Sequence, residues 1–271
     1  MNLFDIDLAS LAMIQDVPGV IMQHMSFTVA NIPVLIMMAV NITLGFMLYT
    51  NVAGIQKRDG VDCYPVNVHC SMIVWDVMCA IMCWVLAFNN HFFWLFTLFG
   101  VLEPIWVVSE IMAIKAVVKT SRQEEFGKYV KGEVTEKQAW MYIIFMICIW
   151  ICVWGSISFI LGGFKNASLL VTWPYTNLVF PWICWVLWEK RAAKTGTQFG
   201  NSQKVQLTLV FQVTLSWFPY TWFVLMMPFL STPMFYLAGA LTSAFCIRNY
   251  LKVRKLPLPN EESKLLAQNA D

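Results

Sequence analysis

The chain has 271 residues, of which 59% are hydrophobic and only 13% are charged, and it contains 20 Phe, 13 Trp and 16 Met. Soluble domains average about 45–50% apolar and about 25% charged residues, so this composition excludes a soluble globule and indicates a polytopic membrane protein. The net charge of +2 does not indicate nucleic-acid binding, because the basic residues are sorted by loop, as described below.

The N-terminal segment, residues 1–28, precedes the first long apolar run and contains neither Lys nor Arg. Its apolar side chains alternate with Asp5, Asp7 and Asp16, a pattern typical of a helix that lies in the membrane interface. A lid over the helix bundle is the alternative interpretation. We expect no cleaved signal peptide, because the segment has no basic start and Asp16 and Pro18 interrupt its apolar stretch.

Seven apolar runs follow, each long enough for the roughly 20 helical residues that cross a bilayer core. They span about residues 29–51, 64–88, 92–118, 139–162, 167–188, 205–227 and 231–251. Short loops join the runs, so we expect one all-α transmembrane domain over residues 29–251. The last stretch, residues 252–271, is polar, and we expect a mobile tail there.

The basic residues give an independent orientation for these seven spans. Of the 18 Lys and Arg residues, 17 lie in the loops after the first, third and fifth runs, at the adjoining helix ends, or at the C-terminal end; Lys165 is the exception. Basic residues concentrate on the cytoplasmic side of membrane proteins. We therefore predict an N-terminus outside or in the lumen and a cytoplasmic C-terminus.

Three acidic residues lie deep in the apolar runs, where ionisable groups are costly and are candidates for function. Asp76 lies about twelve residues into the second run, roughly 18 Å along a helix axis. Glu103 lies at similar depth in the third run, and Glu110 lies seven residues further on the same helical face. We expect all three around one cavity, where burial and like charge keep at least one protonated as a general acid. The alternative is that they only hydrogen-bond neighbouring helices or pair with Lys115.

Aromatic residues and one histidine share this depth. His69 lies seven residues before Asp76 and is either a proton relay or a hydrogen-bonded packing residue. Aromatic faces in a pocket can stabilise a cation, although packing or an interfacial belt is the alternative for each ring. The tryptophans concerned are Trp75, Trp106, Trp182 and Trp217.

The sequence indicates no cofactor. It contains no D-D-x-x-D motif for a divalent metal, and the two other histidines, His24 and His91, are expected near the outer surface, which disfavours haem ligation. The eight cysteines form no C-x-x-C motif, and seven lie in apolar runs, where cysteine acts as a small buried hydrophobe. We therefore predict neither a metal site nor a disulfide.

Four short stretches in the first half of the chain carry a family resemblance. They are Gly45–Tyr49, Lys57–Gly60, Cys70–Asp76 and Trp106–Glu110. With the chain length, the helix count and the short loops, they resemble the small seven-helix membrane terpene cyclases of fungal meroterpenoid and indole-diterpene pathways, the family of the paxilline- and pyripyropene-pathway cyclases. Asp76 stands where that family has Glu, Met72 stands where it has Asn, and the last run lacks the usual acid.

The resemblance implies a protein of the endoplasmic reticulum membrane that acts on a lipophilic prenylated substrate. An embedded acid, Asp76 or Glu110, with Glu103 as a substitute for the missing one, would protonate an epoxide or olefin. Rings would then close through carbocations without a metal. Two alternatives stay open: an intramembrane sterol or lipid isomerase, and a seven-helix transporter or binding protein for a small apolar molecule, although the sequence has no internal repeat.

Overall fold

The computed structural model describes residues 15–268, which form helices joined by short turns, with no strand among them. The expected all-α class is thus confirmed. Seven helices have at least 15 residues: α3 (Ile32–Asp59), α4 (Val66–Asn89), α5 (Trp94–Thr120), α7 (Glu136–Ile160), α8 (Ser168–Thr195), α9 (Gln203–Trp217) and α11 (Pro233–Arg254). Shorter α-helices are α2 (Val17–Met25), α6 (Arg122–Phe126), α10 (Trp222–Met226) and α12 (Glu261–Gln268).

Five helical segments among these residues are long and apolar enough to cross a membrane, which supports the expected membrane character. They are Val29–Asp59, Val66–Asn89, Glu136–Ile160, Ser168–Thr195 and Gln203–Met226. The two other long helices, α5 and α11, are not among these five; α5 contains two Glu and two Lys, and α11 ends in a cluster of basic residues. The sevenfold span count and the orientation of the termini stay predictions.

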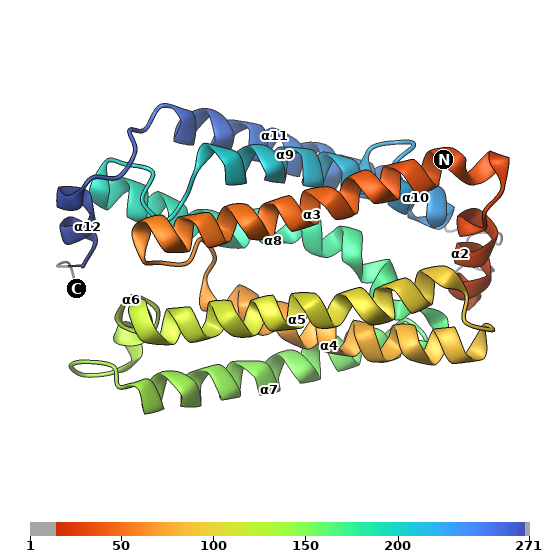
Figure 1. Cartoon of the computed structure of the whole chain (residues 1–271), viewed down its shortest axis with the longest axis horizontal. Helices are drawn as coiled ribbons and strands as arrows, with labels where there is room; N and C mark the ends of the chain where they lie inside the picture. Colours follow the sequence, from red (N-terminus) through yellow and green to blue (C-terminus); the bar gives the residue numbers. More distant parts are fainter. Residues whose placement is uncertain (1–14, 269–271) are drawn as a thin grey trace.

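The long helices form two groups, seen one above the other in Figure 1. α4 packs along α5 and α7, and α9 packs along α3 and α11. α8 runs from the first group to the second and contacts α4, α9 and α11. Pro174 and Pro181 lie inside α8, where proline removes a backbone donor and bends a helix. Because α8 is bent, its side chains reach the space between the two groups of helices.

The sixth apolar run, predicted as one helix over 205–227, is divided into α9 and α10. α9 ends at Trp217, and α10 begins at Trp222. Pro219 has no backbone N–H to continue the helix, and Tyr220 adopts a left-handed conformation with φ of 71°. The break turns α10 toward α2 and α3, which it contacts at the end of the bundle.

Both terminal segments pack against the bundle. α2 buries Val17, Ile21 and Met25 in the main core, and the Trp94 indole donates to the Met25 carbonyl at 2.8 Å. The first part of the predicted interfacial segment, residues 1–14, lies outside the described residues. The segment predicted as a polar tail from residue 252 begins inside α11, and its α12 contacts α8.

Two arginines tie together the loops at the predicted cytoplasmic end. Arg58 binds both carboxylate oxygens of Asp59 at 2.6 Å, and it donates to the Asn201 carbonyl at 2.6 Å. Arg191, which is buried in α8, binds both oxygens of Glu124 in α6 at 3.0 and 2.7 Å. Bidentate pairs of this kind fix orientation as well as contact. They hold the ends of α3, α6 and α8 in register around the loop before α4.

Candidate active site

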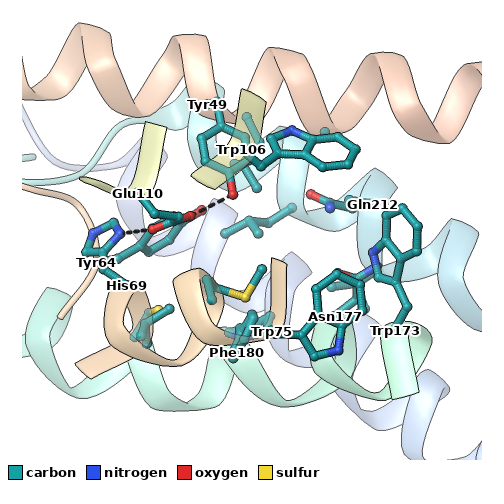
Figure 2. A pocket seen from close by; sticks show the side chains of 18 of the residues that line it. Tyr49, Tyr64, His69, Trp75, Trp106, Glu110, Trp173, Asn177, Phe180 and Gln212 are labelled. Carbon is teal, nitrogen blue, oxygen red and sulfur yellow. Dashed lines mark hydrogen bonds and ion pairs between the residues drawn. The ribbon is translucent and has the colours of Figure 1, made fainter. Parts of the chain in front are cut away.

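A cavity lies between the two helix groups and encloses about 970 Å³ of space, its open mouth included. Its walls come from α3, α4, α5, α8 and α9 and from the loop before α4 (Figure 2). Helices α7 and α11 contribute no lining residue and form the outer sides of the bundle.

His69 joins two carboxyl groups at one end of this cavity. Its Nδ1 atom lies 2.5 Å from Glu110 Oε2, and its Nε2 atom lies 3.0 Å from Asp62 Oδ1, an ion-pair distance without hydrogen-bond alignment. The Tyr49 hydroxyl donates to Glu110 Oε1 at 2.7 Å, so that Tyr49 and His69 converge on Glu110 in Figure 2. We call Tyr49, Asp62, His69 and Glu110 the His69 cluster. These two hydrogen bonds fix the orientation of the Glu110 carboxyl group.

Asp62, which lies before α4, is held firmly in this cluster. It accepts a short hydrogen bond from the Gln56 amide and one of 2.8 Å from the backbone N–H of Tyr64. Burial alone would raise the pKa of the Asp62 carboxyl, but the charge of His69 and the hydrogen bonds from Tyr64 and Gln56 outweigh it and hold the pKa below the ordinary value. The Arg191 guanidinium donates to the Asp62 carbonyl and fixes the loop.

Asp76 and Glu103 are both buried, at 1% and 0% exposure, but they face different surroundings. Asp76 lines the cavity, and its Oδ2 atom has no hydrogen-bond partner in the described part of the chain. Glu103 does not line the cavity, and neither of its oxygens has a hydrogen-bond partner within residues 15–268. Of the three carboxyls expected around one cavity, the structure brings together Asp76 and Glu110 and leaves Glu103 outside.

Three tryptophans form an aromatic side of the cavity. The Trp173 ring lies edge-on to Trp75 at 5.5 Å and to Trp106 at 6.1 Å between centroids. The Trp75 indole donates to the Thr172 hydroxyl at 3.0 Å, which fixes its ring. The Trp106 indole N–H is buried and has no acceptor among the residues that the structure describes. Two predicted pocket residues, Trp75 and Trp106, thus lie together with one, Trp173, that was not selected for the pocket.

The other two predicted pocket tryptophans lie elsewhere. Trp182 stacks on Phe245 with centroids 3.8 Å apart and donates to Thr242 at 3.0 Å. Trp217 donates to Ser243 at 2.8 Å. Neither ring lines the cavity; both pack against α11 instead.

Three carboxamides face the cavity from the helices opposite α4 and α5. Asn41 lies on α3, Asn177 on α8 and Gln212 on α9. We call them the amide wall. Asn177 donates to the Ser216 hydroxyl at 2.9 Å, and the Gln212 Oε1 atom is buried with no partner from residues 15–268.

Sequence reasoning missed Asp62 and the amide wall for different reasons. Asp62 was counted with a loop, although it lies seven residues before His69, and the fold of that loop brings it back to the ring. The amide wall was missed because only ionisable residues were searched at depth. An uncharged amide inside an apolar run is also costly to bury without a hydrogen-bond partner. The presence of Asn and Gln inside these runs is therefore a sequence signal that points to all three residues.

Comparison with protein-family models, with curated proteins and with solved structures finds no match to this chain. Among the described residues, no group of three or more His, Cys, Asp or Glu side chains is arranged to hold a metal ion. The absence of a cofactor stays a prediction.

Proposed function

We propose that this protein is a membrane-embedded terpene cyclase, which protonates an epoxide or olefin of a lipophilic prenylated substrate and closes rings through carbocations. The observation that supports it most is one cavity that holds Asp76, whose Oδ2 atom is buried with no hydrogen-bond partner among the described residues, together with the paired carboxyl of Glu110 and several tryptophan faces. The two carboxyls differ in their partners, which is the usual way in which one site separates an acid from a base.

Asp76 acts as the acid. A carboxyl buried without a partner is held neutral, because an unpaired charge in apolar surroundings is costly. Its proton passes to the epoxide oxygen as the C–O bond breaks, and the nearest double bond attacks the tertiary cation that results. General acid catalysis of this kind contributes roughly 10²–10⁴-fold to rate.

Glu110 ends the reaction. Its carboxylate is held by Tyr49 and His69, and its negative charge favours a cation nearby. The final carbocation loses a proton to this carboxylate and leaves a double bond. One proton is given and one is taken up, so the product has the mass of the substrate, and transfer of the proton from Glu110 back to Asp76 restores the site.

The aromatic side of the cavity protects the cations between these two steps. Aromatic faces attract positive charge by up to about 2 kcal/mol each in desolvated sites, and they offer no lone pair that would trap a carbocation. Trp75, Trp106 and Trp173 are positioned for this role by their contacts with one another.

The test is incubation of membranes that contain the protein with an epoxidised farnesyl-phenol. We expect a product of unchanged mass and shifted retention, in which a hydroxyl group replaces the epoxide and each new ring after the first removes one olefinic double bond, at the same rate with and without EDTA. A product that keeps the epoxide and forms no new ring, with only a double bond moved, would instead indicate the isomerase. Cyclisation abolished by EDTA and restored by Mg²⁺ would contradict the proposed mechanism.

A further inference from the structure

The acidic and basic side chains that line the cavity lie on one side of it, and the carboxamides lie on the other. Helices α4 and α5 supply the titratable groups His69, Asp76 and Glu110. The opposite helices, α3, α8 and α9, supply the uncharged amide wall. In Figure 2, Asn177 and Gln212 lie at the end of the cavity away from Tyr64 and His69. The amides are thus separate from the His69 cluster and take no part in the proposed proton transfers.

The amide wall has unused hydrogen-bonding capacity that faces the cavity. The Asn41 amide reaches the Leu215 carbonyl only at 3.5 Å, the outer limit of a hydrogen bond. The Gln212 Oε1 atom is buried with no partner in the part of the chain that the structure describes. A buried polar atom left unpaired costs about 1–3 kcal/mol. A ligand group that pairs with these amides removes that cost.

The charges around the cavity limit what this ligand group can be. Neither Lys nor Arg lines the cavity among the described residues, whereas Asp76 and Glu110 do. A diphosphate or a carboxylate at the amide wall would therefore be buried with neither Lys nor Arg to pair with it, which is strongly unfavourable. A hydroxyl or carbonyl group has no such cost and satisfies an amide as donor or acceptor.

We propose that the amide wall is a head-group subsite, which binds a neutral hydroxyl or carbonyl group of the substrate and so directs the other end of the lipophilic chain. The placement of the other end of the chain at Asp76 rests on the proposed cyclase function, whereas the binding of the head group by the amide wall does not. The subsite selects neutral prenylated alcohols, phenols or ketones over prenyl diphosphates.

The experiment compares two probes that lack an epoxide and cannot react: a farnesyl-phenol and the matching farnesyl-benzene, which lacks the hydroxyl. Binding to the full-length protein in detergent is followed by quenching of tryptophan fluorescence, because four tryptophans line the cavity. The test variants are Gln212→Leu and Asn177→Leu. Asn51→Leu is the matched control, because Asn51 also donates to a hydroxyl of α9, that of Thr208 at 3.2 Å, but does not line the cavity.

We expect the wild type to bind the phenol about 5- to 10-fold more tightly than the benzene, the value of one net hydrogen bond. Gln212→Leu and Asn177→Leu should lose that preference, and Asn51→Leu should keep it. Equal binding of the two probes by the wild type would overturn the proposal. Tighter binding of farnesyl diphosphate than of the phenol would overturn it as well.

The two proposals can fail separately. If the wild type prefers the phenol but cyclises no epoxide, the subsite stands and the cyclase function fails. If it cyclises epoxides of both head groups equally and binds both probes equally, the cyclase function stands and the subsite fails.

Discussion

Glu124 and Glu125 are neighbours in α6, and their surroundings move their pKa values in opposite directions. Burial raises the pKa of both carboxyls. For Glu124, the hydrogen bonds and charge of Arg191 outweigh burial and bring the pKa below its ordinary value. Glu125 accepts only a long bond of 3.4 Å from the Val66 backbone, and burial raises its pKa from 4.5 to about 7. The folded protein therefore binds a proton at Glu125 that the unfolded chain has lost.

Because the folded protein holds this proton, its stability against unfolding depends on pH. The raised pKa of Glu125 means that the stability of the fold decreases as pH rises from about 4.5 to about 7 and then levels off. The contribution is roughly 3 kcal/mol over that window. Glu125→Gln should remove the slope, measured by thermal unfolding in detergent at pH 5, 6, 7 and 8.

Glu124→Gln is the control for this measurement. The pKa of Glu124 is lowered, so its contribution is present above the ordinary value of 4.5 and is lost as pH falls below it. The variant should therefore be less stable than the wild type across the whole range, with the slope kept. A Glu125→Gln protein with the wild-type slope would contradict the assignment.

At the scale of the elements, α9 and α11 approach each other closely at Gly239. A Cβ atom built on Gly239 would lie 2.0 Å from the Trp217 ring, so only glycine fits there. Trp217 also binds Ser243 on the next turn of α11. The contact joins α11 to α9, the helix that carries Gln212.

Gly239→Ala should destabilise the protein by about 1–3 kcal/mol, the cost of overpacking. Gly155→Ala in α7 is the matched control, because a Cβ there meets no atom within 4 Å. We expect a lower midpoint of thermal unfolding for the first variant and an unchanged or higher one for the second. Equal midpoints would show that the helices separate freely at Gly239.

The helices could be predicted from the sequence because apolar runs and their length are local properties. The predicted runs at 64–88 and 92–118 correspond closely to α4 and α5. The break between α9 and α10 was not predicted: Pro219 marks it in the sequence, but α5 and α8 continue through their prolines, and the left-handed backbone at Tyr220 shows that the helix ends here. For the site, Asp76 and Glu110 follow from depth in a helix. The pairing of His69 with Asp62 depends on how a loop folds back, which no local pattern contains.

At the scale of the whole molecule, the arginine ion pairs and the His69 cluster of the cavity lie toward the same end of the helix bundle. The end of the bundle with α6 and α12 holds the Arg58 and Arg191 pairs, and the His69 cluster lies on that side of the cavity. The predicted orientation places this end in the cytoplasm. In this orientation the C-terminal ends of α3 and α8 face the cytoplasm, and α2 faces the lumen.

Tags at the two ends of the chain should therefore differ in protease sensitivity in sealed microsomes. We expect the N-terminal tag to be protected and the C-terminal tag to be cleaved, since basic loops face the cytoplasm. Detergent should make both tags accessible, as the control. Equal protection of both tags would rule out an odd number of spans.

The central claim is that Asp76 gives the proton, and three amide variants test it on the epoxidised farnesyl-phenol. Asp76→Asn keeps the shape but removes the acid, and turnover should fall about 10²–10⁴-fold, while fluorescence shows substrate still bound. Glu110→Gln should also lose activity, because it removes the carboxylate that ends the reaction. Glu103→Gln is the comparison variant: Glu103 is equally buried and lies outside the cavity, but its charge acts on Asp76, so turnover should fall less than in Asp76→Asn. Near-normal cyclisation by Asp76→Asn would contradict the account.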